Sequence, residues 1–190
     1  SIVPTATEYG ALSVNGMSSS SRSGSKANSA MVVQIRKEDI PDKGIFSVLD
    51  WVENIERNSF RDNFMAPGQR MADFVDNKFS STLPKTTYAP GLVSCDLYEV
   101  LPPIVSSSLK DGFINFGRMT RGKFLTNEAV MIASETRTSS PIRILRDADF
   151  KSISGLYPAG EGAGYAGGIV SAAIDGIEVA KTLAKCLIHC

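Results

Sequence analysis

The sequence predicts an α/β protein in which a mostly helical block separates two segments rich in predicted β-strands. Strand-like apolar runs stand near the beginning of the chain, and amphipathic helical patterns fill residues 40–127. A strand-like run, a glycine-rich turn and a long helical pattern follow one another at the end. We therefore expect three parts: residues 1–39, a helical inserted or cap domain at 40–127, and residues 128–190.

Composition excludes several functional classes. The 190 residues can bury a sizeable core, and 20 basic residues balance 20 acidic ones, which argues against a nucleic-acid or anionic lipid partner. No apolar run reaches the length of a membrane span, and no targeting signal is visible. Three cysteines are too few for a disulfide framework. We expect a soluble protein of a reducing compartment, either the cytoplasm or an organelle matrix or stroma.

The first segment has two strand-like runs, at residues 11–14 and 30–35. The polar loop between them, residues 15–28, is longer than a hairpin needs. Loops of this length are often either functional or flexible. Arg22 and Lys26 could accordingly meet an anionic substrate or simply be solvated.

The helical block begins with an amphipathic pattern over residues 46–57, where Trp51 is expected in the core or at a domain interface. Residues 66–69 indicate a helix start with a proline near its first turn, followed by an apolar stripe up to Phe79. A third helix is predicted from Pro102 to about Gly117.

The last segment returns to predicted strands. Residues 129–134 predict a buried strand, and a dense polar turn follows at 135–141. Residues 142–145 are strand-like, and residues 153–159 are predicted to form the final strand. From Gly168 onward, small and apolar residues mark one face of a long helix. Strand, glycine turn and helix together make half of a dinucleotide-type α/β unit.

The glycine-rich turn is the most informative feature, with six glycines in residues 155–168. A turn of this kind before a helix offers free N–H groups and the positive end of the helix dipole to an electron-rich group. It does not match a P-loop, because no Lys-Ser/Thr follows. Glu161 argues against a phosphate, and could either stabilise the helix start or accept hydrogen bonds from ligand hydroxyls.

A metal or redox site is conceivable near the end of the chain, where His189 stands between Cys186 and Cys190. Terminal thiols in a reducing compartment explain the same residues more simply. No metal site is predicted.

Two segments, ETRTSSPIRI (135–144) and GLYPAGEGAGYAGGI (155–169), carry a family resemblance. They resemble the C-terminal signature of a family of FAD-dependent dehydrogenases (FAD/NAD(P)-binding oxidoreductases). SAAIDG (171–176), VNGMS (14–18), Arg22 and ANSA (27–30) are also similar to it, and the middle of the chain matches loosely through residues 66–69 and 88–91.

The resemblance implies the C-terminal part of an FAD-binding, Rossmann-like domain of the glutathione-reductase type, with an inserted helical substrate or cap domain. It implies that Glu161 binds the ribityl chain of FAD and that N–H groups around Gly167, Gly168 and Ile169 face the pyrimidine edge of the flavin. Hydride would move between substrate and flavin N5. The cofactor-binding residues are then Gly160, Glu161, Gly162, Gly167, Gly168 and Ile169.

Substrate-side candidates are Arg22, Arg137, Thr138, Ser139 and Tyr165, the first by its place in the matching N-terminal segment and the others by analogy. Neither Tyr165 nor Arg137 is identified as the proton donor, so the catalytic residue is unassigned.

One departure from the family pattern matters. The N-terminal strand–GxGxxG–helix that holds the ADP half of FAD is absent from this sequence. The site is thus expected to be incomplete, with the remaining half supplied by an N-terminal part of the same protein or by a partner chain. The alternative is a flavoprotein-derived subunit that serves assembly and not catalysis.

Overall fold

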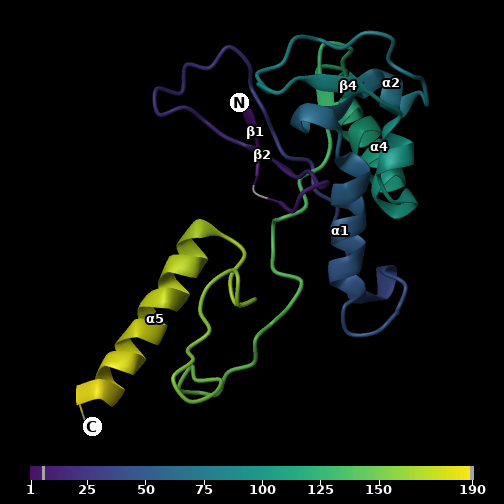
Figure 1. Ribbon diagram of the computed structural model, residues 1–190. Helices are drawn as coiled ribbons and strands as arrows, with labels where there is room; N and C mark the ends of the chain where they lie inside the picture. The colour runs from purple at the N-terminus through teal and green to yellow at the C-terminus, as the bar shows by residue number, and fades with distance from the viewer. Residues whose placement is uncertain (6, 189–190) are drawn as a thin grey trace. The chain divides into compact units, whose positions relative to one another are not determined.

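The computed structural model describes residues 1–5 and 7–188, which form two compact units (Figure 1). The first is Ser1–Thr136, and the second begins at Arg137. The three expected parts, 1–39, 40–127 and 128–190, stay a prediction beside this division into two units. The chain contains both helices and two small sheets, as the α/β prediction requires.

The first unit holds both sheets. Strands β1 (Ile2–Pro4) and β2 (Val14–Gly16) pair antiparallel. In the second sheet, β3 (Ala66–Arg70) lies between β4 (Leu92–Ser94) and β5 (Val130–Ile132), parallel to the former and antiparallel to the latter. Strand β5 confirms the strand predicted at 129–134, but its three residues are only half-buried.

The helix predicted to start at residues 66–69 is wrong, because these residues form the central strand β3. Pro67 cannot donate a ladder hydrogen bond, but its carbonyl accepts one from Ala133 at 3.1 Å. Pairing on both sides and nearly complete burial outweigh the local signal of a proline near a helix start. Only the short helix α2 (Met71–Val75) follows.

The other predicted helices of the block are present. Helix α1 spans Ser47–Ser59, and α4 spans Pro103–Met119 with a proline in its first turn. The short α3 (Leu97–Val100) and two 3-10 turns, Lys37–Asp39 and Asp62–Phe64, complete the helical structure of this unit among the described residues. The block at 40–127 is thus less purely helical than predicted, since it contains β3 and β4.

These helices pack around an aromatic core. Phe74 is fully buried, stacks on Tyr98 at a centroid distance of 4.7 Å, and meets Phe113 edge-on at 6.1 Å. Trp51 packs against this cluster, which confirms its expected core role.

The predicted strand at residues 30–35 is wrong. Met31 and Val33 do pack against the core, but the backbone there has no ladder partner. An extended segment that joins no sheet can therefore show the same alternation of buried and exposed residues as a strand.

The second unit contains α5 (Ile169–Ile188), which confirms the long helix predicted after the glycine-rich turn. The strands predicted at 142–145 and 153–159 do not form; only a single bridge joins Ile153 and Leu156. Strands require neighbours to complete their hydrogen bonds, and the described part of this unit offers no sheet to join.

Candidate functional site

The glycine-rich turn is held by backbone conformations that favour glycine. Gly155, Gly160 and Gly164 have φ values of +80°, +71° and +83°. Within the turn, the Gly164 N–H donates to the Glu161 carbonyl at 2.9 Å, and the Tyr165 N–H donates to the Gly160 carbonyl at 3.0 Å. The cluster therefore folds as a closed turn between residues 160 and 165.

Gly164 also allows a second segment to lie against the turn. A Cβ at this position would come within 2.6 Å of the Ile142 carbonyl oxygen. The Ile144 N–H donates to the Ala163 carbonyl at 3.1 Å, and Arg143 Nε donates to the Gly164 carbonyl at 3.0 Å. The two sequence segments singled out above, 135–144 and 155–169, thus meet at residues 142–144 and 163–164.

The turn leads directly into the N-terminus of α5, whose first residue, Ile169, is 91% exposed. The first N–H groups of a helix have no partner within it, and they lie at the positive end of its dipole. Ser171 takes up one nearby donor, because its hydroxyl accepts from the Gly168 N–H at 3.2 Å and donates to the Gly168 carbonyl at 3.0 Å. The Ala172 N–H donates to the Gly168 carbonyl at 2.9 Å, which leaves the N–H groups of Ile169, Val170 and Ser171 as those without a partner inside the helix.

The glycines around this N-terminus leave open space. A Cβ at Gly162 would meet nothing within 4 Å, and at Gly167 the nearest atom would be Ser139 Oγ at 3.6 Å. At Gly168 it would be Ser171 Oγ at 3.7 Å. No atom of the described chain therefore requires a glycine at these three positions, which fits a surface that a flat ligand approaches closely. The donors, the dipole and the open glycines suit an electron-rich group of a ligand.

Of the predicted contact residues, Glu161 is exposed, and its carboxylate has no hydrogen-bond partner among the described residues. Its backbone carbonyl is engaged with the Gly164 N–H. The side chain is thus available to hydroxyl groups of a ligand.

The substrate-side candidates fall into different settings. The Ser139 hydroxyl lies beside Gly167, whereas Arg137 and Thr138 are exposed in the preceding turn. The Tyr165 hydroxyl donates to the Ile144 carbonyl at 3.0 Å, so this proton is already engaged within the unit. Arg22 belongs to the exposed loop of the first unit.

Sequence reasoning missed a buried polar cluster in the first unit. Glu56, on α1, is 1% exposed, and its carboxylate accepts a hydrogen bond from the Thr136 hydroxyl at 2.7 Å. The Thr136 hydroxyl also lies 3.0 Å from the hydroxyl of the buried Ser13. Three distant positions thus meet directly before Arg137. The only sequence signal was a pair of hydroxyl residues within segments already singled out, and nothing linked them to Glu56.

It also missed a mostly shielded ion pair in the second unit, between Arg146 and Asp175. Its oxygen–nitrogen distances are 2.6 and 3.0 Å. Asp175 lies within the SAAIDG segment, but its partner is distant in sequence.

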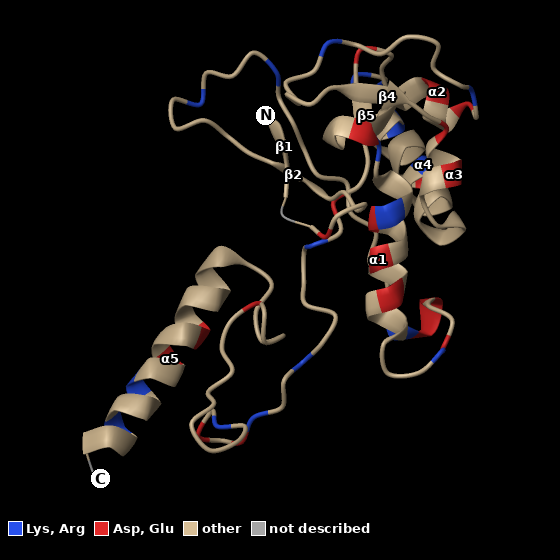
Figure 2. Ribbon diagram, in the orientation of Figure 1, with Lys and Arg blue, Asp and Glu red and all other residues tan. Residues whose placement is uncertain are grey.

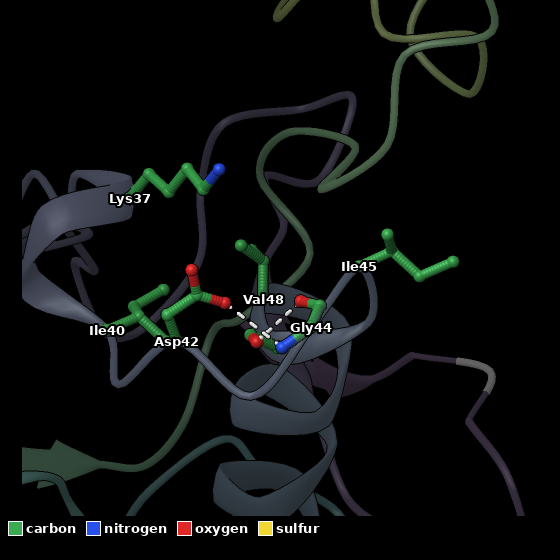
Figure 3. Close-up of a pocket in the computed structure, with 7 residues that line it drawn as sticks. Lys37, Ile40, Asp42, Gly44, Ile45 and Val48 are labelled. Atoms are coloured by element: carbon green, nitrogen blue, oxygen red, sulfur yellow. Dashed lines mark hydrogen bonds between the residues drawn. The ribbon is translucent and has the colours of Figure 1, made fainter.

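A small surface pocket elsewhere is not a second candidate. It precedes α1 and is lined by Lys37, Ile40, Asp42, Gly44, Ile45, Ser47 and Val48 (Figure 3). Its polar groups close the local turn: Asp42 Oδ1 accepts from the Gly44 N–H at 3.0 Å, and the Ser47 hydroxyl donates to the Gly44 carbonyl at 2.7 Å. None of the predicted site residues lines it.

No cluster of His, Cys, Asp and Glu residues in the described ranges is arranged to hold a metal ion. Cys186 is exposed, and His189 and Cys190 lie outside the described residues. Among the described helices, none combines the length and apolar character needed to cross a membrane.

Comparison with known proteins identifies a family for residues 1–138, a range that ends before the glycine-rich turn. Residues 1–138 match the family described as "FAD-dependent protein, C-terminal domain-like". The chain is also 40% identical over 187 residues to an uncharacterized protein of Clostridium beijerinckii (strain ATCC 51743 / NCIMB 8052). The match covers 95% of this chain and 35% of the relative, so the chain spans about a third of the length of the curated relative that it matches. The chain belongs to the FAD-dependent protein, C-terminal domain-like family.

Proposed function

We propose that this chain supplies the flavin end of the FAD site in an FAD-dependent oxidoreductase of the dehydrogenase type. The observation that carries the proposal is the glycine-rich turn that leads into the exposed N-terminus of α5. Membership in an FAD-dependent family supports the choice of ligand. The substrate of the reaction is a small molecule.

In this proposal each part of the turn has a separate role. Glu161 accepts hydrogen bonds from the ribityl hydroxyls, and Gly160 and Gly162 let the backbone approach the same part of the cofactor. N–H groups at Gly167 and Ile169 face the pyrimidine edge of the ring, while Gly168 contributes chiefly its lack of a side chain, because Ser171 engages its N–H. When bound, the flavin supplies the redox chemistry by exchanging a hydride equivalent with the substrate.

The helix N-terminus would favour the reduced cofactor. Negative charge gathers on the pyrimidine side of a reduced flavin, and oriented N–H groups with the positive end of a helix dipole stabilise such charge. The Ser139 hydroxyl lies beside Gly167, so this substrate-side candidate is assigned to the same edge. Arg137 and Thr138 precede it in the same exposed turn.

The exposed surface of α5 supports a site that another segment completes. Figure 2 shows α5 with few charged residues and none in its first turn. Among its apolar side chains, Val170, Ile174 and Ile177 are 71%, 57% and 53% exposed. Apolar surface of this extent on one helix is typical of a face that another element covers.

We propose that the covering element is a Rossmann-like sheet with a GxGxxG turn, contributed by an N-terminal part of the same protein or by a partner chain. Residues 142–145 and 153–159 would join that sheet as strands, since they are strand-like in sequence and here have no sheet to pair with. The greater length of the Clostridium beijerinckii relative supports a source within one polypeptide.

The proposal predicts that the protein that includes the GxGxxG segment purifies with bound FAD. Its visible spectrum should show flavin absorbance that bleaches on reduction, whereas the 190-residue chain by itself should retain little FAD, because the ADP half of the site is missing. The measurement is the flavin-to-protein absorbance ratio after gel filtration.

A protein that contains the GxGxxG segment and yet shows no flavin, even after incubation with FAD, would contradict the proposal. If that protein instead held a stable partner without any cofactor, the chain would be an assembly module derived from a flavoprotein.

A further inference from the structure

The ion pair between Arg146 and Asp175 stands out in the described part of the second unit because its side chains are mostly shielded from solvent. The two side chains are 9% and 14% exposed, whereas Lys181 and Glu178, paired on the same helix, are 61% and 52% exposed. Both guanidinium nitrogens of the Arg146 fork contact the carboxylate. This two-point geometry is available to arginine and not to lysine.

The remaining hydrogen bonds of the pair go to the backbone of the glycine-rich turn. Arg146 Nη1 donates to the Pro158 carbonyl at 2.7 Å, and Asp175 Oδ2 accepts from the Gly160 N–H at 2.8 Å. The pair thus contacts the turn on both sides of residue 159. Asp175 belongs to α5, so these bonds connect the turn to the helix that follows it.

Two aromatic rings enclose the guanidinium group. Arg146 Cζ lies 3.6 Å from the centroid of the Tyr165 ring and 4.6 Å from that of Phe150. Tyr165 is itself held by two hydrogen bonds. Its N–H donates to the Gly160 carbonyl, and its hydroxyl donates to the Ile144 carbonyl. The guanidinium group of Arg146, with its partner Asp175, therefore contacts both ends of the turn, residues 158–160 and residue 165.

We propose that Arg146 and Asp175 are positioning residues for the flavin end of the site, an inference that rests on the function proposed above. The pair fixes the segment 160–162, assigned to the ribityl chain, relative to the first turn of α5, assigned to the ring. Neither residue touches the cofactor in this proposal. A change in the pair alters how the turn and the helix N-terminus meet the flavin at the same time.

The charge on Asp175 persists in mildly acidic solution. The hydrogen bond from Arg146, followed by that from the Gly160 N–H, lowers the pKa of the Asp175 carboxyl below its ordinary value. Since the pKa is lower in the folded chain than in the unfolded one, the pair contributes its full stability above the unfolded pKa. That contribution is lost only as pH falls through the folded pKa.

The test compares Arg146→Lys and Asp175→Asn with wild type in the protein that includes the GxGxxG segment. Hydrogen exchange of peptides that contain residues 158–165 reports whether the pair holds the turn. Flavin retention and the midpoint potential report whether it positions the cofactor. The matched control is Arg143→Lys, because Arg143 also contacts this turn and Tyr165 but is exposed.

We expect both variants to speed exchange in 158–165 roughly tenfold or more, since each loses charge-assisted hydrogen bonds. Flavin should dissociate faster by a similar factor and its midpoint potential should shift, with Arg143→Lys close to wild type in both. Asp175→Asn keeps the side-chain shape, so it provides a folded variant if Arg146→Lys does not fold.

Unchanged exchange in a folded variant would overturn the proposed clamp. Faster exchange with unaltered flavin retention and potential would overturn the positioning role and leave a structural ion pair. Wild-type protein without flavin would instead remove the proposed function, and with it the positioning role. The exchange data would still show whether the pair holds the turn.

Discussion

Replacing Gly164 with alanine is expected to destabilise the second unit and to reduce FAD binding. The φ of +83° costs a non-glycine residue about 1–3 kcal/mol. The added Cβ would also lie 2.6 Å from the Ile142 carbonyl oxygen, so the segments 142–144 and 163–164 must separate. Thermal unfolding followed by circular dichroism, together with the flavin-to-protein ratio, measures both effects.

Gly162→Ala is the matched control, because its Cβ would meet nothing within 4 Å and its φ is not in the left-handed region. It should unfold within about 0.5 kcal/mol of wild type. Equal stability of the two variants would show that the turn does not have the close contact described here.

The second large effect is expected at Gln69, in the central strand of the first unit. Its side chain is fully buried, accepts a hydrogen bond from the Leu97 N–H at 2.9 Å and donates one to the Lys78 carbonyl at 2.8 Å. Gln69→Leu preserves the approximate volume but leaves the buried Leu97 N–H without its acceptor. We expect a loss of ~1–3 kcal/mol from that group and a smaller loss at the less buried Lys78 carbonyl.

Chemical denaturation of Gln69→Leu and Gln34→Leu measures this difference. Gln34 is exposed, so the same chemical change there should have little effect on the free energy of unfolding. If Gln69→Leu were as stable as Gln34→Leu, the buried bridge from β3 to the N-terminus of α3 would be absent.

The helices and strands differ in how well the sequence could predict them. Helices α1, α4 and α5 were predicted because an amphipathic helix makes its backbone hydrogen bonds locally and shows its buried face in the spacing of its residues. Strand β3 was mistaken for a helix start, since proline is frequent in the first turn of a helix and rare in a central strand. Its two neighbours in the sheet, which decide the outcome, are distant in sequence.

The candidate site also has parts that the sequence could predict and parts that it could not. The glycines before a helical pattern predicted the turn and the helix N-terminus, because both features depend on residues that are adjacent in sequence. The contacts of Arg146 with Asp175 and of Glu56 with Thr136 depend on how separate segments fold together. An arginine or a glutamate in an amphipathic or polar context gives no local sign that it is buried.

The central claim is that flavin approaches the N-terminus of α5, and the flavin content of a Gly167→Val variant tests it most directly. A Cβ at Gly167 would make only an ordinary contact, 3.6 Å from Ser139 Oγ, so the chain itself should tolerate the change. The account predicts that the variant, made in the protein with the GxGxxG segment, keeps the melting temperature of wild-type apoprotein but purifies with much less FAD. Undiminished flavin content would contradict the account.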